Sequence, residues 1–375
     1  VVAYRELRER EIRLLKRLGD LEDNPQNVMF SSVSLGNFHG IELTDFAAET
    51  AKLALFIAEY QANARFADVF GRMPALLPLR DGGHIVCGNA LREDWDKICP
   101  PPVEGEEVYI AGNPPYYGAK KRTAKQTEDM IANKLDDVLL LDYVSTWFVK
   151  AARFANGQVP FAFVATSSIC QGEQVAPLWT RILDTGLAID FAYVPFEWKN
   201  SAAANAGVWV TVIGLSKRHP SKRRLYQNSV ISIGQEISPY LVFGSFVAVA
   251  STSASHFGLP EMVMGCNPVD GKKLSVSAEE REKIIREDGR AEKFLKPYLG
   301  GDELIEDGRR YCVWISDNDL DEASKIHPIA KRIEDCRKYR VGAGRDARKV
   351  AHLPHRFCYS TNKNRPALAI PNSQS

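Results

Sequence analysis

The chain has 375 residues, of which 45% are hydrophobic and 25% are charged, so it is long enough to build two domains. No apolar run approaches the roughly 20 residues that a membrane-spanning helix needs, which argues against an integral membrane protein. The seven cysteines stand singly, without CxxC or His-rich spacing. They predict neither a disulfide framework nor a metal site, and they favour the reducing cytoplasm.

The net charge of +1 conceals an uneven distribution along the chain. Residues 20–110 carry 15 Asp/Glu and 6 Lys/Arg, whereas residues 331–365 carry 3 Asp/Glu and 11 Lys/Arg. A separate basic segment of this kind predicts contact with a polyanion, and the alternative is an ordinary solvated helix face. The side chains that we expect to make this contact are Lys331, Arg332, Arg337, Lys338 and Arg340.

The first two hundred residues alternate short β-like runs with helical patterns, which is typical of a parallel α/β sheet. The expected helices cover residues 4–18, 45–63, 124–155 and 173–184, and the expected strands cover residues 38–43, 84–90, 109–116, 159–166, 188–196 and 207–215. After residue 215 a basic segment leads into shorter strands and scattered helices. We therefore predict two domains, residues 1–215 and residues 216–375.

The most informative motif is Asn113-Pro114-Pro115-Tyr116, which directly follows an apolar run. The two prolines fix the backbone and remove two N–H donors, so carbonyl oxygens are free to face a ligand. The Asn113 amide oxygen adds an acceptor, and Tyr116 adds a flat aromatic face. Two acceptors that bind the hydrogens of an aromatic amine would localise its lone pair for attack. Such an arrangement stabilises a transition state through preorganised dipoles.

The alternative interpretation of this motif is a simple break between a strand and a turn. Asparagine and proline are both common turn residues, and a motif of four residues often matches by chance. The residues elsewhere in the chain therefore decide between the two interpretations.

Three such residues are Glu42, Asn89 and Phe196. Glu42 ends a predicted strand before a helix, where a carboxylate can accept both hydroxyls of a ribose or simply complement the helix dipole. Asn89 can hydrogen-bond the edge of an adenine or serve as a turn residue. Phe196 can stack on a planar ring opposite Tyr116 or belong to the core. Taken singly, each fits its structural alternative at least as well, so the signal lies in their combined order.

That order resembles a known family. The strings GIEL (40–43), GNAL (88–91), GNPPY (112–116) and LDYV (141–144), with the segment around Phe196, look like the motifs of gamma-type amino-methyltransferases. More narrowly, they resemble the methyltransferase segment of large single-chain, type IIG/IIL-like bacterial restriction–modification enzymes. Later strings such as NPVDGKK (267–273) extend the resemblance into the target-recognition region of those proteins.

The resemblance implies a class I, Rossmann-like methyltransferase sheet followed by a mixed α+β target-recognition domain. It implies a bacterial, cytoplasmic enzyme that transfers a methyl group from S-adenosylmethionine to adenine N6 in duplex DNA, with the target base flipped out of the helix. By position, the catalytic pocket would consist of Asn113, Pro114, Pro115, Tyr116 and Phe196. Glu42 would bind the cofactor ribose, Asn89 its adenine, and Asn113 would border the cofactor. The basic segment would then contact DNA.

The chain departs from this family at its start. The Gly-rich cofactor loop of the family precedes the first helix, whereas this sequence opens within that helix, so we expect an N-terminally truncated sheet with an unpaired edge. One alternative is therefore a catalytically incomplete DNA-binding remnant. A weaker one is a methyltransferase of RNA or of protein glutamine, because NPPY also occurs in those enzymes. The large, partly basic second domain favours duplex DNA.

Overall fold

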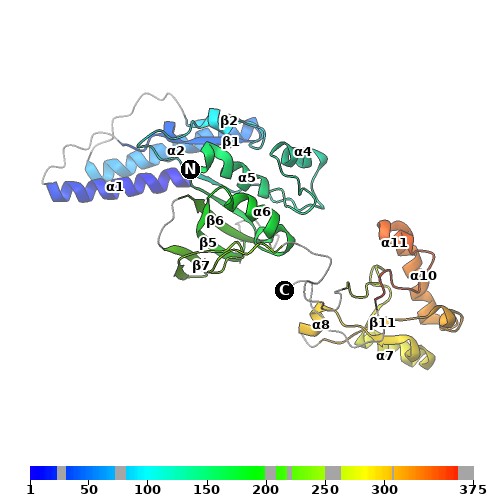
Figure 1. The fold of residues 1–375 in the computed structure, drawn as a ribbon. Helices are drawn as coiled ribbons and strands as arrows, with labels where there is room; N and C mark the ends of the chain where they lie inside the picture. The colour runs from blue at the N-terminus through cyan, green and yellow to red at the C-terminus, as the bar shows by residue number, and fades with distance from the viewer. Residues whose placement is uncertain are drawn as a thin grey trace. The chain divides into compact units, whose positions relative to one another are not determined.

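The structure, a computed structural model, describes residues 1–22, 31–71, 82–198, 208–217, 222–249, 263–305 and 308–361. The chain divides into two compact units, Val1–Ser251 and Thr252–Ser375, and each is described by itself (Figure 1). Within the described ranges, every helix is too short or too polar to cross a membrane.

The first unit contains a six-stranded sheet with the strand order β3-β4-β6-β5-β7-β8. Its strands are β3 (Ile110–Gly112), β4 (Phe161–Thr166), β5 (Ala188–Glu197), β6 (Trp209–Ser216), β7 (Arg223–Gln227) and β8 (Val230–Gly234). β3 and β4 are parallel, β5 and β7 are parallel, and β6 runs antiparallel to both β4 and β5. The carboxyl ends of β3, β4 and β5 therefore share one edge of the sheet.

One face of this sheet carries the main core. The residues of β4 alternate between buried and half-buried, as expected for a strand with one well-covered face. The ring of Phe163 in β4 lies 5.3 Å from that of Phe148 in α5 (Ser145–Arg153), centroid to centroid. Phe148 in turn lies 5.9 Å from Trp179 in α6 (Val175–Leu183). These contacts hold α5 and α6 against the sheet, whose edge is thereby fixed.

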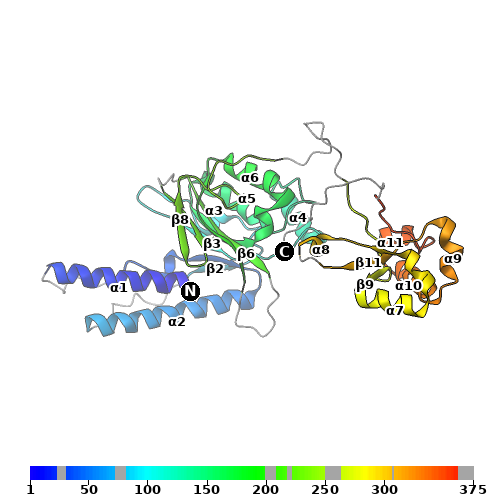
Figure 2. The same cartoon turned by 90° about the horizontal axis from the view of Figure 1, so that it is seen from below.

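A second, two-stranded sheet accompanies two long helices. β1 (His39–Glu42) pairs in parallel with β2 (His84–Cys87). α1 (Val2–Glu22) and α2 (Asp45–Phe70) lie side by side (Figures 1 and 2). Among the described residues, β1 pairs only with β2 and β3 only with β4, so both leave one edge unpaired.

Most predicted elements occur near their expected positions, but the prediction of one continuous helix over residues 124–155 is wrong. It is two helices, α4 (Ala124–Ala132) and α5. Lys134 adopts a left-handed conformation with φ 60°, which an α-helix cannot continue through. Leu135 and Leu141 in the connecting segment are completely buried. The apolar pattern that suggests one helical stripe thus partly belongs to a packed loop.

The first unit also extends beyond the domain boundary predicted after residue 215. β7 pairs with β5 and β8 pairs with β7, so the sheet continues to Gly234. The division between the two units falls after Ser251. Part of the predicted basic connector, residues 218–221, lies outside the described residues.

The second unit is a small α+β domain. Its strands are β9 (Ser275–Ser277), β10 (Leu295–Pro297) and β11 (Arg310–Val313), in the antiparallel order β10-β11-β9. Its helices are α7 (Ala278–Glu287), α8 (Gly301–Ile305), α9 (Leu320–Ser324), α10 (His327–Gly342) and α11 (Arg345–Lys349). α10 buries Ile329, Ile333 and Cys336 in a core of its own.

Candidate active site

The Asn113–Tyr116 segment leaves the sheet directly after β3, at the carboxyl edge. The last residue pair between β3 and β4 joins Gly112 to Phe163. The strand is shorter than predicted because two prolines follow, and proline cannot donate to a strand ladder. Pro114 is buried whereas Asn113 is exposed. The motif is therefore a proline-stiffened turn, anchored in the protein, whose amide side chain is open to solvent.

Tyr116 is half-buried against the main core, and its hydroxyl donates a hydrogen bond to the Asn113 amide oxygen. Burial raises the pKa of this hydroxyl, which therefore stays protonated and remains a donor at neutral pH. The acceptor that we predict for a target amine thus has an internal partner. An amide oxygen has two lone pairs, so a ligand amine can share this oxygen or displace the tyrosine.

A polar cluster lies next to this motif at the end of β4. Asp142 accepts hydrogen bonds from Ser168 Oγ at 2.5 Å and from Thr166 Oγ1 at 3.4 Å. The neighbouring Tyr143 donates its backbone N–H to the Tyr117 carbonyl at 2.9 Å. These bonds connect the loop after β3 to the end of β4 and to the start of α5. The loop is therefore held from two sides.

Phe196 lies at the same edge of the sheet but several strands away. It pairs with Val210 of β6, and Val210 pairs with Thr166, the last residue of β4. Two strands separate β3 from β5, which at about 4.8 Å per strand corresponds to about 14 Å. The ring of Phe196 lies 6.5 Å from that of Trp198. The strands that precede Tyr116 and contain Phe196 are thus well separated in the sheet. The two side chains could contact the same base only if that base lay between them.

Glu42 and Asn89 meet at the carboxyl end of the two-stranded sheet. Glu42 pairs with Cys87, and the Gly88 N–H bonds the Glu42 carbonyl at 2.8 Å. The Glu42 side chain is exposed, and among the described residues no hydrogen bond or ion pair involves its carboxylate. Asn89 is half-buried and accepts the Leu91 N–H at 3.0 Å, which is the turn role considered above. It also donates to Asp129 at 3.0 Å, so one of its two amide N–H groups is left.

Asp129, in α4, belongs to the candidate site although no motif in the sequence indicates it. Its carboxylate is 2% exposed and accepts hydrogen bonds from Asn89 Nδ2 at 3.0 Å, Arg92 Nε at 2.5 Å and the Tyr143 hydroxyl at 2.8 Å. Burial alone would raise the pKa of Asp129, but the bonds from Arg92, Tyr143 and Asn89 outweigh it and lower that pKa. Since Tyr143 also holds Tyr117, Asp129 links the loop after β2 to the loop after β3. Asn89 and the tyrosine of the LDYV string are the parts of this network that the sequence marks.

The loop after β2 is fixed by a second set of contacts. Lys150 of α5 donates to the carbonyls of Ala90 at 2.8 Å and Glu93 at 2.6 Å. Trp95, at the start of α3 (Trp95–Ile98), donates its indole N–H to the same Ala90 carbonyl at 2.8 Å. Burial lowers the pKa of Lys150, whose ammonium also lies 5.2 Å from the centre of the Trp95 ring. Asn89 is therefore presented by a rigid loop.

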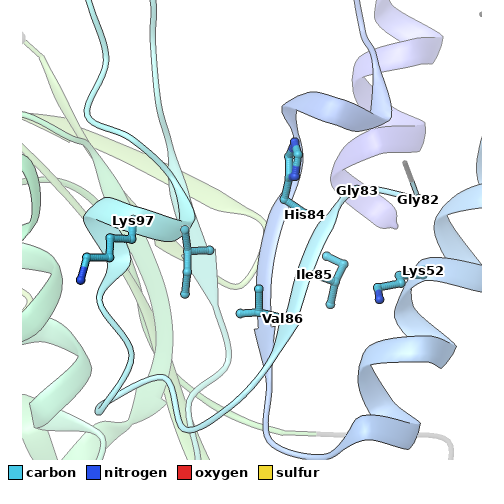
Figure 3. A pocket seen from close by; sticks show the side chains of 8 residues that line it. Lys52, Gly82, Gly83, His84, Ile85, Val86 and Lys97 are labelled. Carbon is cyan, nitrogen blue, oxygen red and sulfur yellow. The ribbon is translucent and has the colours of Figure 1, made fainter. Parts of the chain in front are cut away.

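A cavity in the first unit lies away from the predicted site residues. It has a volume of 530 Å³ and opens at the start of β2, between α2 and α3, with Lys52, His84 and Lys97 among its lining residues (Figure 3). The predicted site residues do not line it, and Asn89 follows the opposite end of β2. We therefore do not assign the site to this cavity. In the described part of the chain, no three His, Cys, Asp or Glu side chains gather to hold a metal ion.

For two of the five basic residues that we predict to contact a polyanion, the prediction is wrong. Arg340 is completely buried, and its guanidinium donates to five backbone carbonyls, so it cannot reach a phosphate. Arg332 is largely buried and donates to the carbonyls of Lys273 and Ser275 and to the carboxylate of Glu280 at 2.8 Å. The exposed members are Lys331, Arg337 and Lys338. Charge counting alone could not separate these two groups.

Comparison with known proteins places the chain in a family. Residues 1–227 match the model of the MmeI DNA-methyltransferase domain, and residues 244–375 match the model of the MmeI target recognition domain. DNA methyltransferase A of Bacillus subtilis (strain 168) is 34% identical over an alignment of 382 residues, which covers 100% of this chain and 43% of that protein. A solved structure of the type IIL restriction-modification enzyme MmeI in complex with DNA matches with a TM-score of 0.81 and 30% identity.

That match covers 96% of this chain and 49% of the MmeI chain, so the sequence spans roughly half the length of either relative. The fold predicted from the motifs, a methyltransferase sheet followed by a recognition domain, is confirmed. The chain belongs to the family of the MmeI DNA methyltransferases.

Proposed function

We propose that this chain transfers a methyl group to adenine N6 in duplex DNA, as the catalytic and recognition part of a bacterial, cytoplasmic restriction–modification enzyme. The observation that carries the proposal is the Asn113–Tyr116 turn, with a buried Pro114 and an exposed Asn113 at the carboxyl edge of the sheet. The names of the two relatives, a DNA methyltransferase and a restriction-modification enzyme bound to DNA, support it.

In this proposal the Asn113 amide oxygen and the Pro114 carbonyl accept the two hydrogens of the target amine. Both oxygens are held before the substrate arrives, because Pro114 is buried and the following loop is tied to Tyr143. The amine becomes nucleophilic as its lone pair leaves the ring conjugation. Since this change develops in the transition state, the two acceptors act mainly on the chemical step.

The methyl donor in this proposal is S-adenosylmethionine, which supplies an activated methyl group when bound. Glu42 and Asn89 fit its adenosine half: Glu42 offers an exposed carboxylate for the ribose hydroxyls, and Asn89 keeps one N–H for the adenine. The two residues lie at the carboxyl ends of paired strands, where ligands of open α/β sheets bind. Asp129 and Lys150 hold the Asn89 loop in place.

A paired adenine is out of reach inside the duplex, so the base must be extruded before it can react. We assign Tyr116 and Phe196 to stacking on the extruded base, which is worth about 1–3 kcal/mol for each aromatic contact. With 2-aminopurine at the target position, Tyr116→Ala should weaken the fluorescence increase. Tyr116→Phe keeps the flat face and should retain it. An unchanged signal in Tyr116→Ala and Phe196→Ala would return both rings to the core.

The decisive test is Asn113→Ala in the native protein, measured by single-turnover methylation of duplex DNA. Loss of one preorganised acceptor should slow the chemical step about 100–1000-fold while DNA affinity stays nearly unchanged. The matched control is Asn318→Ala, an exposed asparagine of the second unit, which should methylate normally. A normal rate in Asn113→Ala would remove this residue from the mechanism. Absence of methylation in the unaltered protein would favour a DNA-binding remnant.

A further inference from the structure

The segment Asn267–Lys273, with the sequence NPVDGKK, has an unusual backbone. We call it the lysine loop. Val269, Gly271 and Lys272 adopt left-handed conformations with φ of 47°, 62° and 65°. This region is unfavourable for a β-branched residue such as valine and uncommon for lysine. The loop therefore keeps its shape only because the surrounding structure imposes it.

Arg340 imposes this shape from below. Its buried guanidinium donates to the carbonyls of Pro268 at 2.5 Å and Val269 at 3.3 Å, both within the loop. The same guanidinium donates to three carbonyls of the C-terminal segment, those of Val350, Leu353 and Arg356. One side chain thus ties two distant segments of the chain to α10.

Two further contacts complete the loop. Asp270 is 4% exposed, and its carboxylate accepts the backbone N–H groups of Lys272, at 3.1 Å, and Leu274. The ring of Tyr339 lies so close to Gly271 that a Cβ on this glycine would fall 2.6 Å from it. The negative charge of the loop is consequently buried and hydrogen-bonded, whereas Lys272 and Lys273 are exposed.

The neighbouring face of α10 continues this basic surface. Successive side chains of an α-helix are rotated by about 100° around its axis. Relative to Tyr339, the side chains of Lys331 and Lys338 are therefore rotated by about 80° and 100° in one direction. Arg337 is rotated by about 160° in the other direction. The buried residues Ile333 and Cys336 lie opposite the two lysines. Lys331 and Lys338 therefore form the outer ridge of the helix beside the lysine loop, and Arg337 lies on its far flank, 3.9 Å from Glu334.

We propose that the lysine loop and the Lys331–Lys338 ridge form a preordered surface for the phosphates of duplex DNA, with Arg340 as its positioning residue. The proposal rests on the function proposed above. Lys331 and Lys338 are seven residues apart, about 10.5 Å along the α10 axis, which is similar to the rise of three phosphates of one strand along the DNA axis. Because the loop is already ordered, DNA binding would not have to order it.

The test compares two doubly substituted chains that each lose two positive charges. Lys272→Gln with Lys273→Gln alters the proposed surface, and Lys283→Gln with Arg286→Gln alters two exposed basic residues of α7. Affinity of the 375-residue chain for a random-sequence duplex is measured by fluorescence anisotropy between 50 and 200 mM salt. The loop variant should lose roughly 10-fold in affinity at the lowest salt, and its salt dependence should flatten by about two units.

The control variant should stay within about twofold of the unaltered chain, since its charges lie away from the proposed surface. Equal losses in both variants, or no loss in the loop variant, would overturn the inference while leaving the proposed function intact. Failure of the unaltered chain to bind duplex DNA would count against both proposals. These lysines are exposed, so the substitutions do not threaten folding.

Arg340→Lys tests the positioning role. Lysine keeps the charge but offers three donors in place of five. Amide exchange at residues 268–273 should accelerate and DNA affinity should fall, although Lys272 and Lys273 are intact. Unchanged exchange together with lost affinity would mean that Arg340 does not act through the loop. If this variant does not fold, the lysine variants still decide the inference.

Discussion

Asp129 in the first unit and Arg340 in the second are both buried charged side chains that gather several hydrogen bonds, but the two side chains do different things. Asp129 in the first unit collects hydrogen bonds from three side chains, one of them the cationic Arg92. Arg340 in the second unit donates to five backbone carbonyls, none of which carries a charge. The Asp129 carboxylate thus orients the side chains of Asn89, Arg92 and Tyr143, whereas the Arg340 guanidinium holds a backbone shape.

The difference follows from the chemistry of the two groups. A carboxylate accepts only, so it can fix amides and hydroxyls, the groups that a cofactor site needs. A guanidinium donates only and in a planar fork, which suits the carbonyls of a loop that has left regular secondary structure. In the first unit the buried charge of Asp129 therefore orients neighbouring side chains. In the second unit the buried charge of Arg340 maintains an unfavourable backbone conformation.

The largest expected effect separates the two. Arg340→Met should destabilise the second unit by roughly 3–5 kcal/mol, because several buried carbonyls lose their donor at once. Denaturant unfolding monitored by a probe in the second unit measures this change. Arg337→Met, an exposed arginine of the same helix, should stay within about 0.5 kcal/mol of the unaltered chain. Similar costs for the two arginines would remove Arg340 from its organising role.

A smaller effect is expected for Asp129→Asn. The amide keeps the size of the side chain but replaces one acceptor oxygen with a donor, which then faces the Arg92, Tyr143 or Asn89 donors. The cost should be about 1–3 kcal/mol in unfolding free energy. Because Asn89 loses its orientation, the concentration of methyl donor needed for half-maximal methylation should rise if Asn89 binds that donor as proposed. Glu128→Gln, whose side chain is 69% exposed, is the matched control and should change neither quantity.

The sequence indicates the candidate site residues at the strand ends, but it does not indicate the side chains that hold them in place. The sequence points to Asn113 and Glu42 as candidates because polar residues at strand ends in an α/β pattern mark the edge of the sheet where ligands bind. Asp129 was missed because it stands in an ordinary amphipathic helix, and its three partners come from positions 89, 92 and 143. Such a network depends on tertiary contacts, which no local pattern encodes.

The basic segment shows the same limit of sequence-based prediction, here for positively charged residues. Its positive charge was evident, yet Arg332 and Arg340 serve the interior while Lys331 and Lys338 face outward. Helical periodicity could have flagged Arg340, which is four residues after the buried Cys336 and seven after Ile333. Its carbonyl partners could not have been foreseen, since they belong to loops without a periodic pattern.

The contribution of a single hydrogen bond to Asp129 can be measured by removing one of its donors. Tyr143→Phe deletes the hydroxyl that bonds Asp129 but keeps the ring, which packs edge-on against Trp147 at 5.0 Å. The expected cost is about 1 kcal/mol, the usual net value of a hydrogen bond. A double-mutant cycle with Asp129→Asn should give a coupling energy of similar size, since the two residues are in contact. Simple additivity would show that the hydroxyl and the carboxylate act independently.

The smallest expected effect is a pH dependence that Arg340 should not share. The folded-state pKa of Asp129 lies below its usual value of about 3.9, because three hydrogen bonds to the carboxylate outweigh burial. The folded state therefore favours the ionised form. The resulting stabilisation is complete at pH values above the pKa of Asp129 in the unfolded state and is lost as the pH falls through its pKa in the folded state.

The difference in unfolding free energy between the unaltered chain and Asp129→Asn should be constant from neutral pH to about pH 5 and shrink below about pH 4. The corresponding difference for Arg340→Met should show no such step over this interval, because the Asp129 carboxylate is present in both chains being compared. A step of equal size for both variants would trace the acid sensitivity to other carboxylates.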